Sequence, residues 1–164
     1  MKKLSLVAAL VLAGLASLPA QAAVNVPAPF AVIINLTTAC AISTPPVGMT
    51  IAYLSNAPAT SATIPVGITC TNTLPYDLTI STTPAAAAIA NPVTSTAAAL
   101  TYNLNIAAGG AGAGAASTTS SLLGNHGSGT AQTYTIGAYL PSQSGTCGTA
   151  TCTSTDTYFL NVSY

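Results

Sequence analysis

Apolar and polar residues alternate along a segment near the beginning of the chain. The apolar positions recur at every second residue: Val24, Val26, Ala28, Phe30, Val32, Ile34 and Leu36. This period of two is the pattern of a β-strand with one buried face. Such a strand at the start of a domain promotes aggregation unless another chain accepts it, so the pattern predicts a role in assembly. Pro27 and Pro29 lack amide hydrogens, and regular pairing is therefore expected from Phe30 to Leu36.

Strand patterns continue between turn signals that are rich in proline and glycine. Seven segments have the composition of strands: residues 33–43, 49–54, 63–71, 76–82, 100–107, 133–140 and 157–164. Short strands at this spacing are typical of an all-β sandwich. The alanine-rich run 85–90 predicts at most one helical turn before Pro92. Residues 109–116 contain only glycine and alanine and predict a flexible surface loop.

The first 22 residues have the organisation of a secretory signal. Two lysines precede an apolar stretch, and Ala20-Gln21-Ala22 supplies a small-x-small cleavage site, so the mature chain is expected to begin at Ala23. The apolar stretch is shorter than the roughly 20 residues that span a bilayer, and no membrane insertion is expected. After the signal peptide, residues 1–22, we expect an N-terminal strand extension, residues 23–36, and one domain, residues 37–164.

Charge is almost absent from the expected mature chain. The only two basic residues, Lys2 and Lys3, lie in the signal, and the only acidic side chains are Asp77 and Asp156. Nucleic-acid binding requires cationic groups that neutralise phosphates, so this class of partner is excluded. Stability must then come from apolar burial, backbone pairing and covalent cross-links.

Four cysteines in an exported chain indicate disulfides, for which three pairings are possible. Cys147 and Cys152 lie five residues apart, a spacing that suits a small closed loop and leaves Cys40 to pair with Cys70. A zinc site is the rival interpretation. It would need closely spaced ligands, but the chain has no Cys-x-x-Cys motif and one distant histidine, so neither metal nor cofactor is expected.

The residues that catalysis would need are equally sparse. Asp77 and Asp156 are predicted to be solvated turn or edge residues, and His126 lies in a glycine-rich segment, 124–129, that predicts an exposed turn. A Ser/His/Asp site would lack the Gly-x-Ser-x-Gly elbow, and segment 124–129 lacks the lysine of a phosphate-binding loop. The seven tyrosines are interpreted as packing residues of the sandwich. We therefore expect no enzyme.

Several motifs, in order, resemble those of the spore coat protein U domain family, the domain of subunits in archaic chaperone–usher pili. The strongest is Gly67-Ile68-Thr69-Cys70-Thr71-Asn72-Thr73-Leu74-Pro75-Tyr76, which resembles the family's Cys-Thr-Asn-x-x-Pro-Tyr strand and turn. The others are the alternating segment from Phe30 to Cys40, then residues 100–104, 124–130, 136–141 and 156–164. The resemblance spans essentially the whole mature chain.

The resemblance implies an immunoglobulin-like β-sandwich that lacks its last strand. A periplasmic chaperone would fill the resulting groove first, and the N-terminal strand of a neighbouring subunit would replace it at an outer-membrane usher. The donor strand would present Phe30, Val32, Ile34 and Leu36. The implied function is that of a structural pilus subunit, exported through the periplasm to the cell surface, where the homopolymer serves adhesion and biofilm formation.

Two alternatives stay open. The chain could be an adaptor or tip-proximal subunit that binds a surface or ligand, although its single domain and its strand extension favour the shaft. It could also be a secreted, monomeric coat protein that folds its own N-terminal strand into the groove.

Overall fold

The computed structural model describes Pro29 and residues 31–95, 98–109 and 117–164, in two units, 1–35 and 36–164. The expected signal, Phe30 and most of the glycine/alanine loop lie outside the described residues. In the first unit, residues 31–35 have no regular secondary structure and are exposed. The predicted strand 33–43 therefore begins later than expected, at Cys40, where a partner strand becomes available.

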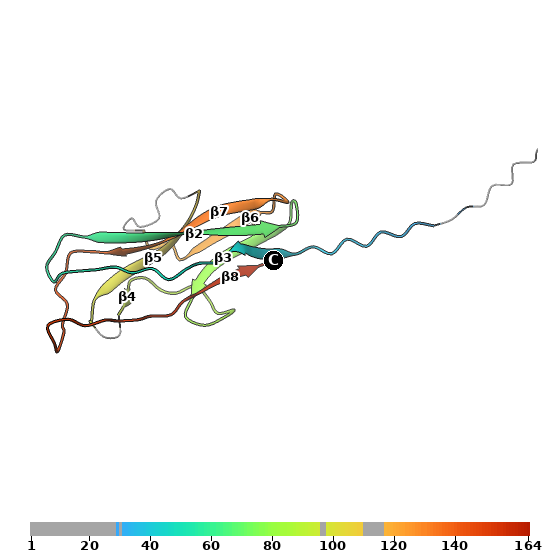
Figure 1. Cartoon of the computed structure of the whole chain (residues 1–164). Helices are drawn as coiled ribbons and strands as arrows, with labels where there is room; N and C mark the ends of the chain where they lie inside the picture. The colour runs from blue at the N-terminus through green and yellow to red at the C-terminus, as the bar shows by residue number, and fades with distance from the viewer. Residues whose placement is uncertain (1–28, 30, 96–97, 110–116) are drawn as a thin grey trace, which may run out of the picture. The chain divides into compact units, whose positions relative to one another are not determined.

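The second unit is built from antiparallel strands, and its described residues contain no helix (Figure 1). The strands are β1 (Cys40–Thr44), β2 (Thr60–Cys70), β3 (Pro75–Ser81), β4 (Val93–Thr94), β5 (Thr101–Ala108), β6 (Ser121–His126), β7 (Ala131–Leu140) and β8 (Phe159–Ser163). The run 85–90 forms no helical turn. The described residues form no helix that is long and apolar enough to cross a membrane.

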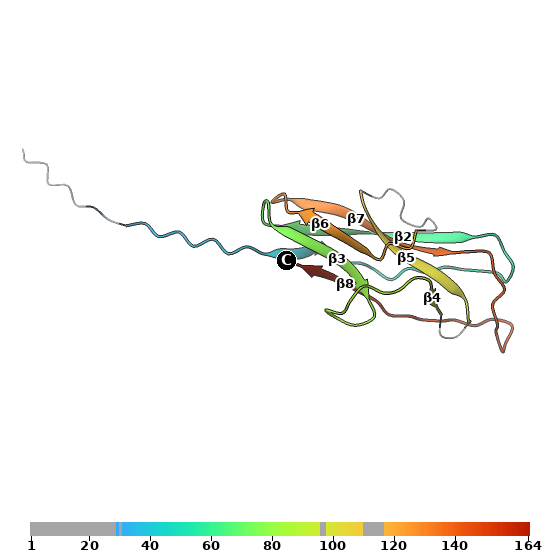
Figure 2. The ribbon, with the colours of Figure 1, turned by 180° about the vertical axis from the view of Figure 1, so that it is seen from behind.

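The strands form two sheets, with the orders β1-β2-β7-β5-β4 and β6-β3-β8 (Figures 1 and 2). In the larger sheet, β2 and β7 pair over ten positions, from Thr60 opposite Leu140 to Thr69 opposite Ala131. In the smaller sheet, β3 lies between β6 and β8. Both sheets contribute to one buried core: Val66, Ile68, Cys70, Tyr76, Leu78, Ile80, Leu104, Ile106, Tyr134, Ile136 and Ala138. This all-β arrangement is consistent with the predicted sandwich.

Alternation along the strands explains which side chains enter this core. In β2, Ile64, Val66 and Ile68 point inward, whereas Thr63 and Pro65, on either side of Ile64, are exposed. Gly67 breaks the pattern because β1 passes close to it: a Cβ there would lie 2.8 Å from the Ser43 hydroxyl. The local pattern thus fixes both the buried face and the close approach of β1.

The two expected disulfides are present at bonding distance. Cys40 and Cys70 lie directly opposite each other, at the first residue of β1 and the last of β2. Cys147 and Cys152 close a short loop between β7 and β8. Both pairings agree with those favoured by the spacing of the cysteines.

Two predicted local features are wrong. Residues 49–54 form no strand, because they have no ladder partner among the described strands. His126 does not lie in a turn but is the exposed last residue of β6, a strand that pairs with β3. The strand β6 escaped the pattern because Leu122 and Leu123 are adjacent apolar residues and Gly124, with a φ of 71°, interrupts the alternation.

Candidate functional site

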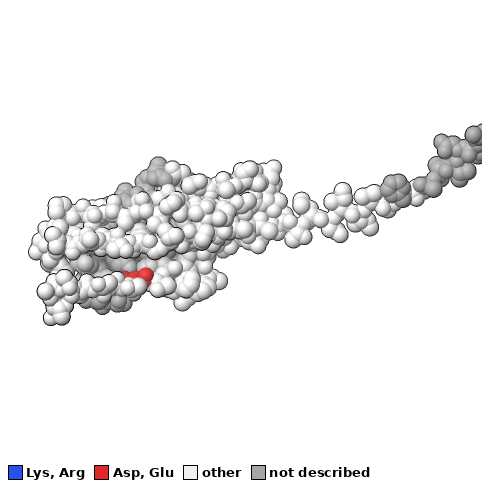
Figure 3. Space-filling model, in the orientation of Figure 1, with Lys and Arg blue, Asp and Glu red and all other residues white. Residues whose placement is uncertain are grey.

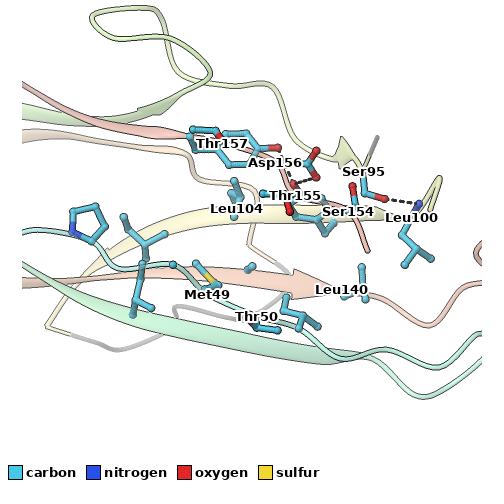
Figure 4. A pocket seen from close by; sticks show the side chains of 18 of the residues that line it. Met49, Thr50, Ser95, Leu100, Leu104, Leu140, Ser154, Thr155, Asp156 and Thr157 are labelled. Carbon is cyan, nitrogen blue, oxygen red and sulfur yellow. Dashed lines mark hydrogen bonds between the residues drawn. The ribbon is translucent and has the colours of Figure 1, made fainter. Parts of the chain in front are cut away.

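A groove with a volume of about 850 Å³ opens into the core of the second unit. Its floor consists of apolar side chains from both sheets: Ile64, Ile80, Leu104, Ile136, Ala138 and Leu140. Its two walls are extended segments far apart in sequence, residues 46–53 and 152–160. Figure 4 shows Met49 on one side of the groove and Asp156 on the other.

The first wall has the side-chain alternation of a strand without being one. Met49, Ile51 and Tyr53 are partly buried toward the groove, whereas Thr50 and Ala52 are exposed. None of the described strands pairs with this segment. The period of two in the sequence therefore predicts correctly which side chains face the core. It does not indicate whether the backbone has a partner strand.

The second wall leads into β8 and alternates in the same way. Ser154, Asp156 and Tyr158 are partly buried, whereas Thr155 and Thr157 are exposed. Pairing with β3 begins only at Phe159, opposite Ser81. Because β8 is at the edge of its sheet, its other side forms no ladder with any strand in the described part of the chain.

The groove therefore has the properties of a site for an additional β-strand. An extended segment without a ladder partner presents backbone N–H and C=O groups that require hydrogen bonds. An added strand can satisfy such groups, while its alternate side chains enter the apolar floor. This arrangement supplies affinity through the backbone and register through the side chains.

A hydrogen-bonded cluster at one end of the groove ties the first wall to the larger sheet. The Gln143 backbone N donates to the Tyr53 hydroxyl at 2.7 Å, and the Gln143 carbonyl accepts from the Asn56 N at 2.9 Å. The Gln143 side chain in turn accepts from the Thr101 N at 2.8 Å and donates from Nε2 to the Thr101 carbonyl. The start of β5 thus holds Tyr53 through Gln143.

A second hydrogen-bonded cluster connects the other wall to Tyr102, the residue that follows Thr101 in β5. The Tyr102 hydroxyl donates to Asp156 Oδ2 at 2.9 Å and lies 2.8 Å from the Tyr158 hydroxyl. The two tyrosine rings meet edge to face, with their centroids 6.5 Å apart. Burial is the largest cause that raises the pKa of Tyr102 well above its ordinary value, and the hydrogen bonds with Tyr158 and to Asp156 raise it further. Burial also raises the pKa of Tyr158.

The surface around the groove carries almost no charge. The described residues include no lysine or arginine, and the whole sequence has two acidic residues. The view in Figure 3 shows a single acidic spot on an otherwise uncharged face. An occupant of this groove is therefore selected by shape and apolar contact far more than by charge.

Three of the four residues predicted to enter the groove from the donor strand are described, and all three are exposed. Val32, Ile34 and Leu36 are 71%, 86% and 80% exposed, as is Ile33 on the opposite face, at 82%. Phe30 lies outside the described residues. Their role as a donor strand stays a prediction.

The carboxylates and the histidine considered for catalysis lie in three different segments, β3, β6 and the stretch before β8. Asp77 lies in β3, where its carboxylate accepts a hydrogen bond from the Gly124 N at 2.7 Å, and His126 is exposed at the end of β6. Within the described ranges, no three His, Cys, Asp or Glu side chains are grouped closely enough to hold a metal ion.

Sequence reasoning missed the polar residues that organise the groove. Asp156 was expected to be solvated, but it is partly buried and bound to Tyr102, so that expectation is wrong. Gln143 follows β7 in an irregular loop, where no periodic signal distinguishes it from its neighbours. Only the alternation around Tyr53 could have pointed to the first wall.

Comparison with known proteins found no matching family model, no matching curated protein and no matching solved structure. The groove is therefore interpreted from its own geometry.

Proposed function

We propose that this chain is the structural subunit of a fibre of the archaic chaperone–usher type. One copy inserts its N-terminal segment as a β-strand into the groove of the next copy. The observation that carries this proposal is a groove over an apolar floor, with one wall, residues 46–53, that none of the described strands pairs with. The same chain carries an exposed segment with one apolar face, of the kind that such a groove accepts.

The chemistry of the segment suits the groove. The side chains of one face, Val32, Ile34 and Leu36 together with Phe30, are apolar, as is the floor. Each would contribute roughly 1.5–3 kcal/mol on burial, before the cost of ordering the segment. The segment carries no charge, so it brings no unpaired ion into the groove. Its backbone can form a strand ladder with the first wall, which none of the described strands pairs with.

Strand insertion between copies is a head-to-tail contact. The donating segment and the accepting groove are different surfaces, so each added copy leaves one of each available and the contact propagates into a filament. An immunoglobulin-like sandwich lacking its last strand is the fold that goes with this mode of assembly. The filament would be exposed at the cell surface and would serve adhesion and biofilm formation.

Two protein partners belong to this proposal. A subunit with an unfilled apolar groove and unpaired edges is prone to aggregate, so a periplasmic chaperone would cover the groove before assembly. An outer-membrane usher would then exchange the chaperone for the segment of the neighbouring copy. The two disulfides fit passage through an oxidising compartment.

Deletion of the N-terminal segment tests the proposal. The full mature chain and a variant without residues 24–36 are each produced with the chaperone, and polymers are sought by electron microscopy and sedimentation. We expect filaments from the full chain and none from the variant. A synthetic peptide of residues 24–36 should bind to the shortened variant in a one-to-one ratio. Filaments that form without the segment would refute the proposal.

The same experiment separates the self-complemented alternative. A full-length chain that stays monomeric, with residues 30–36 protected from hydrogen exchange, would show that the segment occupies its own groove. That result would favour the secreted coat protein over the fibre subunit.

A further inference from the structure

The two walls of the groove flank an apolar floor, which they would bury further if they moved together. An apolar floor gains free energy when it is covered, and protein interiors are close-packed with few large voids. Neither wall is fixed by a strand ladder over residues 48–53 or 153–158. Side-chain hydrogen bonds attach each wall to β5 instead.

In the first of these contacts, the Tyr53 hydroxyl both accepts and donates a hydrogen bond. The hydroxyl accepts from the Gln143 N and lies within donor distance of two carbonyls, that of Gln143 at 2.9 Å and that of Ala57 at 3.0 Å. A tyrosine has one hydroxyl hydrogen, so it donates to one of these carbonyls at a time. Both choices keep the end of the first wall beside Gln143 and, through its side chain, beside Thr101.

The second contact holds the opposite wall in the same way. Tyr102 follows Thr101 in β5, and its hydroxyl binds both Asp156 and Tyr158 of the second wall. The strand β5 itself is fixed, because it pairs with β7 from Asn103 onward. Two consecutive residues of one well-anchored strand therefore carry the tethers of both walls.

We propose that Tyr53, Gln143 and Tyr102 are positioning residues that keep the empty groove receptive to a strand. They act before binding, by preventing the walls from closing over the floor, and so reduce the reorganisation that binding would otherwise require. The inference rests on the proposed function only for the identity of the occupant, the N-terminal segment of a second copy.

A matched set of tyrosine variants tests this role. Tyr53→Phe and Tyr102→Phe each remove one hydroxyl from a tether. Tyr76→Phe removes the same atom from a buried hydrogen bond to Tyr134 and Gln132, which do not line the groove. Each variant is made in the full mature chain and studied at a dilution at which it is monomeric. The measurements are urea unfolding and the rate at which a fluorescent peptide of residues 24–36 binds.

Loss of a tether should slow peptide binding about fivefold, the equivalent of one hydrogen bond. Tyr76→Phe should leave the rate within about twofold of the wild type even where it lowers stability. Gln143→Ala keeps the backbone contacts with Tyr53 but removes the side-chain hydrogen bonds that join them to Thr101, so it should slow binding at least as much as Tyr53→Phe. Binding rates that fall in proportion to stability in all variants would overturn the proposal.

Hydrogen exchange of the two walls distinguishes this inference from the proposed function. If the wild-type chain does not bind the peptide at all, the proposed function fails while the tethers can still be judged. In that case residues 48–53 and 153–158 should exchange more slowly in Tyr53→Phe and Tyr102→Phe, because closed walls pair with each other. Exchange that is unchanged or faster in the walls of both variants would overturn the role of the tethers.

Discussion

Substitution of Ile34 by aspartate should abolish polymerisation, whereas the same substitution at Ile33 should be tolerated. The two residues are neighbours and are almost equally exposed in the free chain, at 86% and 82%, so neither change should disturb the subunit itself. On an inserted strand they lie on opposite faces, because successive side chains alternate. Only Ile34 belongs to the face that carries Val32 and Leu36.

The expected size of the effect follows from the composition of the groove floor. Removing an isoleucine from apolar surroundings costs about 1.5–3 kcal/mol. A carboxylate buried there without a partner costs at least about 1–3 kcal/mol more. The floor offers no cation, and the nearby wall already carries Asp156. A total near 3 kcal/mol or above lowers the equilibrium constant of each joint more than about 100-fold.

Sedimentation velocity of the three mature chains, at equal concentration, measures the effect directly. The wild type and Ile33→Asp should form long polymers, and Ile34→Asp should sediment as a monomer with unchanged urea unfolding. Asn35→Asp, which adds the same charge on the outer face, is a second control. Equal loss of polymers in Ile33→Asp and Ile34→Asp would refute the argument that one face enters the groove.

Three further predictions concern the subunit itself. Replacing Cys40 and Cys70 by serine opens a loop of 30 residues and should lower the free energy of unfolding by about 3–4 kcal/mol in urea titrations. An unchanged midpoint would contradict this. Because the folded-state pKa of Tyr102 lies above its unfolded value of about 10, its stabilisation is complete below that pH and is lost as pH rises further. When the free energy of unfolding is measured from neutral to strongly alkaline pH, Tyr102→Phe should therefore lose less stability than the wild type. An identical dependence on pH in the two proteins would contradict this prediction. Gly127→Ala should lower the free energy of unfolding by about 1–3 kcal/mol, because a Cβ there collides with the backbone oxygen of Thr71. A variant that unfolds at the same temperature as the wild type would contradict this prediction and show that the turn adapts.

The long strands of the fold could be predicted from their apolar content and from the turn residues that mark their ends. In β2, partly buried and exposed residues alternate from Thr60 to Pro65, whereas in β7 residues 134–138 are all buried, as in a strand covered on both faces. The strand β4 has only two residues, too few for any period to emerge. The segment 49–54 shows the converse limit. Alternation records where side chains point, whereas a strand also requires a partner, and the partner is a property of the whole fold.

The family resemblance implied a groove left by a missing strand, which stays a prediction, and the polar residues around the observed groove were not anticipated at all. Gln143 contacts Tyr53 across 90 positions of sequence, and Tyr102 contacts Asp156 across 54. Contacts of this kind leave no periodic trace in a single sequence. Asp156 was misinterpreted for the same reason, since an acidic residue among threonines resembles a solvated edge until its distant tyrosine partner is known.

The position of the Cys40–Cys70 bond determines how the subunit would respond to mechanical tension. In the proposed fibre, a pull on the N-terminal segment reaches the folded domain at Ala39 and Cys40. The covalent bond passes this force across to the end of β2, which shares ten paired positions with β7. The strand β1 therefore cannot be peeled from the sheet one hydrogen bond at a time, and the 30-residue loop between the two cysteines cannot lengthen. Tension would therefore act in shear on the ladder between β2 and β7. Reduction of the Cys40–Cys70 disulfide would make such a fibre extensible under load without changing its length at rest.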